Sequence, residues 1–150
     1  MKTDVIERLI KEALQARTFS YSPYSHYQVG AALLAKDGST YTGCNIENAA
    51  FSPTNCAERT AFFKAVSEGK SEFCAIAVVG GPEDEEITQY AYPCGVCRQV
   101  MMEFCEPKTF QIIAAKSVTE FEVRTLEELL PDGFGAANLR MGDFHEYQIV

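Results

Sequence analysis

The stretch FCAIAVVG at residues 73–80 constrains the fold more than any other part of this sequence. Every residue in it is apolar or glycine. A strand with one face in water alternates polar and apolar side chains, whereas a strand covered on both faces is apolar throughout. In α/β proteins helices provide that cover. We therefore predict a central strand at 73–80, in a sheet with helices on both of its faces.

Three segments have the apolar spacing of amphipathic helices. The first spans residues 3–18. The second begins at Cys56, with Asn55 as the predicted N-cap and Gly69 as the stop signal. The third follows Pro93 and ends near residues 105–107. The pattern predicts that Cys56 lies in the first turn of the second helix, and that Cys94 and Cys97 lie in the first turn of the third.

Four further segments are predicted to be strands. Residues 27–35 and 39–45 flank the turn pair Asp37-Gly38, which favours an antiparallel hairpin. Residues 109–115 and 119–123 are separated by too short a connection for a parallel crossover, so they are also expected to pair antiparallel. Together with 73–80 they make a mixed sheet of about five strands.

The last element predicted is a short helix in TLEELLP, where Thr125 and Glu128 form a capping box. The sum of the elements predicts an α/β fold, a three-layer α/β/α sandwich around the mixed sheet. A chain of 150 residues is about the size of one domain, so we expect a single domain over 1–150. We assign no role to the tail at 141–150.

Composition excludes several classes of function. The formal net charge is −8, which argues against binding to polymeric nucleic acid, because such binding depends on clustered Lys and Arg. The sequence has 47% hydrophobic residues but no apolar run long enough to span a membrane. The first ten residues, MKTDVIERLI, lack the apolar stretch of a signal peptide. We expect a soluble cytoplasmic protein without a membrane partner.

In such a compartment the six cysteines indicate metal binding or catalysis before disulfides. Cys94 and Cys97 form a CxxC pair at a predicted helix start, where both thiols face one side. Cys56 is a third thiol at a helix start. Because helix N-termini favour anions, three thiolates there would be ready to bind a metal at neutral pH. Three sulfur ligands with an open fourth position predict a catalytic zinc site, with one Zn²⁺ per chain.

Glu58 lies two residues after Cys56 and is predicted to be the catalytic group. Its carboxylate is not expected to share the ion, but it can reach a water activated by zinc and move the proton of that water. Three thiolates on Zn²⁺ leave a negative centre, which makes a bound water less acidic than three neutral imidazoles would. Arg59 is predicted to offset this charge by donating hydrogen bonds to the ligand sulfurs.

These residues carry a resemblance to a known family. CAE at 56–58 together with PCGVC at 93–97 is similar to the signature of zinc deaminases, with cysteine in place of histidine as the first ligand. SPYSHYQVGAALL, GCNIENAAFS, NCAERTA and PCGVCRQV, in this order, resemble the small homotetrameric cytidine deaminases. The similarity extends from the first helix to ELLPDGF.

The resemblance implies an activity and a set of substrate contacts. The activity is hydrolysis of cytidine and 2'-deoxycytidine to uridine and 2'-deoxyuridine with release of ammonia, as in pyrimidine salvage. Glu58 would protonate N3 of the base and help ammonia leave. The substrate-binding residues implied are Tyr27 beside the nucleoside, Asn45 and Glu47 at the 3'-hydroxyl, the N–H of Ala57 at the base carbonyl, and Phe134. In the family the phenylalanine of LLPDGF reaches a neighbouring subunit's site, which implies a homotetramer with shared sites.

Two rival functions stay open on the sequence alone. The first is a deaminase of a modified cytosine nucleoside such as blasticidin S. The motif NIE followed by NAA, together with the later DGF, favours the ordinary nucleoside over this alternative. The second is a structural zinc domain in which Cys44 or Cys74 completes a closed four-cysteine site. Such a domain would have no need of Glu58. A free nucleoside is favoured over a nucleotide, because Glu47 would repel a phosphate.

The remaining cysteines, histidines and aromatic residues have simpler interpretations. Cys44, Cys74 and Cys105 are predicted to be small apolar residues in or near the core. His26 and His145 are each isolated and are predicted to lie at the surface or in loops. Aromatic side chains on or beside a helical stripe are usually core, which is the prediction for Phe62 and Phe63. Phe51, which follows NIENAA, is the aromatic of this group that we expect near the substrate. The acidic loop at 83–86 is interpreted as a solvated charge run.

Overall fold

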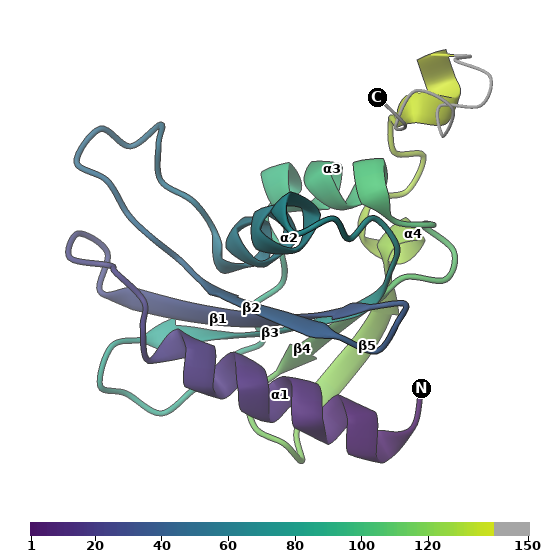
Figure 1. Cartoon of the computed structure of the whole chain (residues 1–150). Coiled ribbons are helices and arrows are strands. Elements are labelled where there is room, and N and C mark those ends of the chain that lie inside the picture. The colour runs from purple at the N-terminus through teal and green to yellow at the C-terminus, as the bar shows by residue number, and fades with distance from the viewer. Residues whose placement is uncertain (140–150) are drawn as a thin grey trace.

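The computed structural model of the protein describes residues 1–139 and contains one five-stranded sheet (Figure 1). The strands follow the order β2-β1-β3-β4-β5. They are β1 (Tyr27–Ala35), β2 (Thr40–Cys44), β3 (Phe73–Pro82), β4 (Gln111–Ala115) and β5 (Phe121–Thr125). The helices are α1 (Thr3–Arg17), α2 (Ala57–Ser67), α3 (Gly95–Phe104), the short α4 (Leu126–Leu129) and a terminal 3-10 turn, η1 (Ala136–Leu139).

The sheet is mixed, as the sequence predicts. Strand β1 pairs antiparallel with both β2 and β3, β3 pairs parallel with β4, and β4 pairs antiparallel with β5. The parallel strands β3 and β4 are joined through α3, the kind of crossover that parallel strands require. The predicted hairpin turn is present, with Gly38 at a φ of 91° and Asp37 Oδ1 accepting from the N–H of Ser39 at 3.0 Å.

Helices cover both faces of the sheet, so the predicted three-layer α/β/α arrangement is confirmed. Helix α1 lies across one face, while α2 and α3 lie side by side on the other (Figure 1). The strand at residues 73–80, predicted from its continuous apolar run, is the centre of the sheet as part of β3. Its side chains contribute to a separate hydrophobic cluster on each face.

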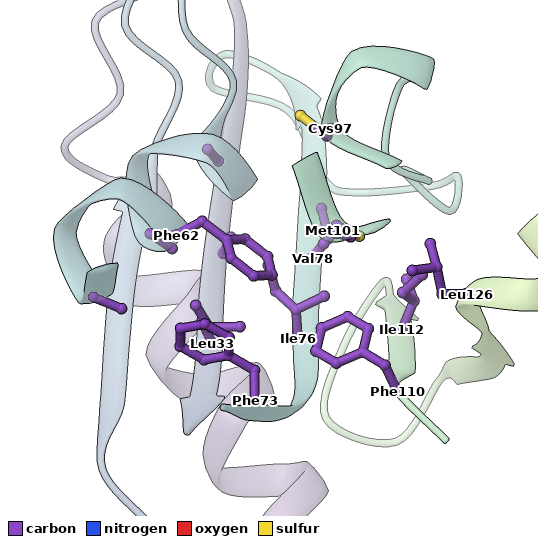
Figure 2. Close-up of a cluster of buried hydrophobic side chains, with 14 of the residues drawn as sticks. Leu33, Phe62, Phe73, Ile76, Val78, Cys97, Met101, Phe110, Ile112 and Leu126 are labelled. Atoms are coloured by element: carbon purple, nitrogen blue, oxygen red, sulfur yellow. The ribbon is translucent and has the colours of Figure 1, made fainter. Parts of the chain in front are cut away.

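The cluster beneath α2 and α3 is built around aromatic rings (Figure 2). Phe62 of α2 is fully buried, with ring centroids 5.1 Å from Phe73, 6.1 Å from Phe110 and 6.2 Å from Phe104. Cys97 stands at one edge of the same cluster. The packing of α3 is thus anchored by apolar contacts directly beside the residue predicted to hold a metal.

The cluster under α1 contains aliphatic residues and alanine, with Phe121 only partly buried beside it. Small residues let the helices approach the sheet closely. A Cβ atom on Gly30 would lie 2.0 Å from the carbonyl oxygen of Ala13 in α1. The same holds on the other face, where a Cβ on Gly43 would lie 2.4 Å from the carbonyl oxygen of Ala57 in α2. These two glycines set the distance of the helices from the sheet.

The two edge strands carry polar side chains at their open sides. On β2, the ammonium of Lys64, which comes from α2, donates to the carbonyl of Thr42. On β5, Arg124 Nη2 lies 3.5 Å from Glu122 Oε2, and both side chains are partly exposed. The β2 edge therefore has at least one of its carbonyl groups occupied, and the β5 edge carries charged side chains.

Two expectations from the sequence are wrong in detail. The N-cap of α2 is Cys56, not Asn55, because the backbone of Asn55 pairs with Ile46 and its side chain donates to Thr60 Oγ1 at 3.2 Å. The core prediction holds for Phe62 but not for Phe63, which lies on the exposed side of α2.

In the described part of the chain, no helix combines the length and apolar character needed to cross a membrane.

Candidate metal centre and substrate site

Three cysteine sulfurs converge where the N-termini of α2 and α3 meet. The Sγ atoms of Cys56, Cys94 and Cys97 all lie within 4.8 Å of one another, and those of Cys56 and Cys94 are 3.8 Å apart. Cys97 is only 1% exposed, whereas Cys94 is open to the surface. Within residues 1–139 this is the one group of three or more Cys, His, Asp and Glu side chains placed to share a metal ion.

The backbone explains why these thiols meet. Cys56 and Cys94 are the N-cap residues of α2 and α3, each with an extended backbone conformation, rather than first-turn residues as predicted. Cys97 lies on the first turn of α3. The partial positive charge and free N–H groups at the two helix N-termini both favour sulfur in its thiolate form. A tight set of three sulfurs at this position fits a Zn²⁺ ion.

Of the three thiols, Cys56 is the one whose pKa shift favours the thiolate form. The pKa of Cys56 is lowered to about 5, because Cys97 and Arg59 donate hydrogen bonds to its sulfur. The pKa of Cys97 is raised by that same hydrogen bond and by burial. Arg59 Nη2 lies 3.3 Å from Cys56 Sγ, which is the contact predicted for this residue. The guanidinium therefore lies where it offsets negative charge on a ligand sulfur.

Glu58 lies in the first turn of α2 and is only 4% exposed. Burial, followed by the charge of the nearby Cys56 thiolate, raises its pKa to about 6. A carboxyl group is rarely buried unless it has a function or a partner. A pKa this close to neutral suits a group that takes up and returns a proton.

The segment that carries Asn45 and Glu47 is tied directly to the metal centre. Ile46 and Asn55 exchange two backbone hydrogen bonds of 2.9 Å, so the NIE segment runs beside the residue that precedes Cys56. Glu47 Oε1 accepts from the N–H groups of Tyr24 and Ser25 at 3.0 and 3.1 Å. The Ser25 side chain is the largest cause that lowers the pKa of Glu47, and the two backbone hydrogen bonds lower it further.

Asn45 organises the start of β1. Its Oδ1 accepts from the N–H of Val29 at 2.9 Å and from the hydroxyl of Ser20, and its Nδ2 donates to the carbonyl of Tyr27 at 2.8 Å. The Tyr27 ring packs near Gly80, where a Cβ would lie 3.2 Å from Tyr27 Cε1 and 3.0 Å from Cβ of Ala91. Ala91 lies two residues before Pro93, the first residue of PCGVC. Tyr27 and Asn45 are thus brought together near residues 93–97, which carry Cys94 and Cys97 and are called the metal loop below.

Phe134 is not brought to this place within one chain. It follows α4, is 57% exposed, and belongs to the C-terminal segment on the opposite side of the molecule from the loop between β2 and α2 (Figure 1). Phe51 lies in that loop and is 78% exposed. The two segments that carry these aromatic residues therefore lie on opposite sides of the layer formed by α2 and α3 (Figure 1).

The other cysteines do not join the cluster, which removes the fourth ligand that a closed structural site would need. Cys44 lines a separate pocket between α1, β2 and α2. Cys74 and Cys105 line another, near the N-terminus of α1. His26 lies at the surface, with Nδ1 at 3.1 Å from Glu83 Oε2. His145 and the tail at 141–150 lie outside the described residues.

The sequence did not predict the roles of two residues of α3, Arg98 and Gln99. Arg98 Nε donates to the carbonyl of Pro93 and its Nη1 to the carbonyl of Leu129, both at 2.7 Å. Gln99 Nε2 donates to the carbonyl of Phe134 at 2.8 Å. Both residues follow Cys97 in the CRQV stretch. Nothing in their spacing separates them from polar residues that face solvent.

A three-layer α/β/α fold with three thiols and a buried carboxyl group at paired helix N-termini defines a class of zinc hydrolases. Comparison with known proteins narrows the class. Residues 3–113 match the family model described as "Cytidine and deoxycytidylate deaminase zinc-binding region". The chain therefore belongs to this zinc-binding deaminase family, which confirms zinc as its cofactor.

Relatives and solved structures agree with the family model. A cytidine deaminase from Sporosarcina psychrophila is 49% identical over 134 residues, which cover 89% of this chain and 94% of that protein. One from Halalkalibacterium halodurans is 50% identical over 133 residues, covering 89% and 96%. The crystal structure of cytidine deaminase from Burkholderia pseudomallei has 45% identity and a TM-score of 0.76, covering 85% of this chain and 97% of that one.

Proposed function

We propose that this chain catalyses the hydrolytic deamination of cytidine and 2'-deoxycytidine, releasing ammonia and leaving uridine or 2'-deoxyuridine. The observation that carries the proposal is the buried Glu58 carboxyl group, two residues after Cys56 in a cluster of three thiols. A structural zinc site needs no such group. The high identity to proteins named cytidine deaminase supports the choice of base and sugar.

Cys56, Cys94 and Cys97 would hold the ion. When bound there, zinc would act as a Lewis acid and would lower the pKa of a water to about 7. Glu58 would accept a proton from the attacking water at its carboxylate and pass it to N3 of the base. It would then take the proton of the new hydroxyl group at C4 and deliver it to the departing amino group, so that ammonia leaves, the C4 carbonyl forms and the carboxylate is restored. Its burial keeps bulk water away from this proton. Arg59, 3.3 Å from Cys56 Sγ, reduces the negative charge that three thiolates would otherwise place beside the reacting base.

The substrate would lie between the metal centre and the NIE segment. The N–H of Ala57, at the first position of α2, has no partner inside its helix and is free to donate to the base carbonyl. Glu47 uses Oε1 for Tyr24 and Ser25, which leaves Oε2 for a ribose hydroxyl. Asn45 holds the strand beside it and keeps a second amide proton for the 3'-hydroxyl. The Tyr27 ring would pack beside the nucleoside.

The negative charge of Glu47 favours a free nucleoside over a nucleotide, because a phosphate on the sugar would be repelled. The low pKa of Glu47 supports this, since the group stays ionised at neutral pH. The reaction converts one nucleoside into another, which fits a role in pyrimidine salvage. A cytoplasmic location agrees with thiolate ligands that must stay reduced.

We also propose that the working form is a homotetramer with shared sites. The support is that the Phe134 side chain is exposed in its own chain, and that its segment lies on the opposite side of the molecule from the loop between β2 and α2 (Figure 1). A second copy could supply the missing aromatic side chain. Residues 1–150 would then form one deaminase domain per subunit, with no contact to nucleic acid or membrane.

The test is conversion of cytidine by the zinc-loaded protein, followed by ultraviolet absorbance, with released ammonia counted in the same sample. We expect equal amounts of uridine and ammonia, similar turnover of deoxycytidine, and weak turnover of cytidine monophosphate. No conversion by a protein with one zinc per chain would contradict the proposal. Turnover of blasticidin S in that case would identify the modified nucleoside as the substrate.

A further inference from the structure

Arg98 links two parts of the chain that flank the metal centre. Its Nε donates to the carbonyl of Pro93, and its Nη1 donates to the carbonyl of Leu129, both at 2.7 Å. Pro93 is the residue before the ligand Cys94, and Leu129 is the last residue of α4. The planar guanidinium holds its donors in fixed directions, so it fixes the orientation of both peptide groups relative to α3.

Gln99, the next residue, holds the segment that follows α4. Its Nε2 donates to the carbonyl of Phe134 at 2.8 Å. One helical turn from Arg98, Met102 also touches this segment, since a Cβ on Gly135 would lie 3.1 Å from Met102 Cε. Asp132, with a φ of 53°, makes the turn that brings the chain back onto α3.

The segment depends on these contacts for its direction. Helix α4 has only four residues, and so short a helix has little stability of its own. The Phe134 side chain is exposed, so it adds little packing within its own chain. The hydrogen bond from Gln99 therefore helps to hold the part of the segment at Phe134, where the side chain is not buried.

We propose that Arg98 and Gln99 form a clamp that positions the metal loop and the Phe134 segment from the same helix. They are positioning residues: Arg98 acts through Pro93 on Cys94, and Gln99 acts through the backbone on Phe134. The part that concerns substrate rests on the proposed function, because it assumes that Phe134 contacts the nucleoside. The part that concerns the metal does not.

The Arg98 half is tested by zinc release from the holoprotein to a coloured chelator. Residues that orient metal ligands typically contribute 10–100-fold in affinity, and for an indirect contact we expect Arg98→Gln to weaken zinc binding about tenfold. Arg98→Lys keeps the positive charge but loses the planar guanidinium with its two separate donors, so its zinc affinity is expected to lie between those of the unaltered protein and Arg98→Gln. The matched control is Arg124→Gln, since Arg124 approaches Glu128 of the same α4 at 4.0 Å without touching the metal loop. Zinc binding unchanged in both Arg98 variants would overturn this half.

The Gln99 half is tested with Gln99→Ala by steady-state kinetics and by hydrogen exchange of residues 130–135. Loss of one hydrogen bond predicts a rise in KM of about three- to tenfold, with kcat and zinc content near those of the unaltered protein. Exchange over 130–135 should become faster. Gln15→Ala on α1 is the control and should change neither quantity. Unchanged exchange and KM would overturn this half.

Together, the measurements of zinc release, hydrogen exchange and deamination separate failure of the clamp from failure of the proposed function. If the unaltered protein does not deaminate cytidine, the proposed function fails, and zinc release and hydrogen exchange still decide the clamp. If it is active but zinc release and exchange match those of the controls, the clamp fails alone.

Discussion

The two faces of the sheet are built differently, and only one of them carries a site. Under α2 and α3 the core contains Phe62, Phe73 and Phe110, with the ligand Cys97 at its edge. Under α1 the buried residues are small or aliphatic, and the cluster includes none of the residues proposed for catalysis. Large rings beneath α2 and α3 fix the helix N-termini where thiols must meet. The α1 face only buries apolar surface of the sheet, and packing of alanine and aliphatic side chains is sufficient for this.

The largest difference between the faces should appear in catalysis. We expect Glu58→Gln on α2 to lower kcat by about 10²–10⁴, the usual contribution of a positioned acid–base group, while zinc stays bound. The matched change on the opposite face is Glu12→Gln on α1, which should leave kcat within about twofold. Deamination assays and zinc content of both variants check this. Full activity in Glu58→Gln would remove the proposed proton transfer.

The second difference concerns stability and the metal together. Phe62→Ala and Leu9→Ala both empty fully buried positions, one on each face. We expect losses of about 3–5 kcal/mol and 2–5 kcal/mol in the free energy of unfolding, measured with urea. Only Phe62→Ala should also speed zinc release, because Phe62 supports the helices that carry the thiols. Equal zinc release in the two variants would show that the faces do not differ in this way.

The two close glycines give a finer comparison. A Cβ on Gly43 would meet the carbonyl of Ala57, and a Cβ on Gly30 would meet the carbonyl of Ala13. Gly43→Ala and Gly30→Ala should each cost about 1–3 kcal/mol of stability through overpacking. Gly43→Ala should also reduce kcat, because it displaces the first turn of α2 and with it Glu58. The comparison breaks if Gly30→Ala reduces kcat by as much at equal residual stability.

The smallest effect is expected at the rim of the site. The Tyr27 side chain is 39% exposed, so its hydroxyl can stay in contact with water. Tyr27→Phe should therefore change KM for cytidine by no more than about twofold. Initial-rate measurements over a range of cytidine concentrations check this. A much larger rise in KM would mean that the hydroxyl binds the nucleoside directly.

Much of the fold follows from local patterns, and what did not follow depends on distant contacts. The continuous apolar run at 73–80 identified the central strand, because no charge interrupts it. Asn55 was wrongly predicted as an N-cap, since a residue preference is local and its pairing with Ile46 is not. The edge strand predicted at 119–123 is found at Phe121–Thr125, where the pairing with β4 sets its limits.

The site shows the same limit of sequence reasoning. Cys56, Cys94 and Cys97 were predictable because helix starts and a CxxC pair leave a local pattern. The contacts of Arg98 were not, because one of its acceptors is Leu129, 31 residues further along the chain. A carbonyl acceptor leaves no mark in the sequence, since every residue has one.

The treatment of the sheet edges bears on how copies of this chain can associate. An open edge is a template for strand addition and aggregation, and natural sheets block it with lysine and other charges. Here Lys64 reaches over from α2 to the carbonyl of Thr42, and Glu122 and Arg124 charge the opposite border. Continuous sheets running from one subunit to the next are therefore disfavoured. In the homotetramer proposed above, the contacts between subunits would then come from the helical layers and loops, and the sheet would be an internal scaffold.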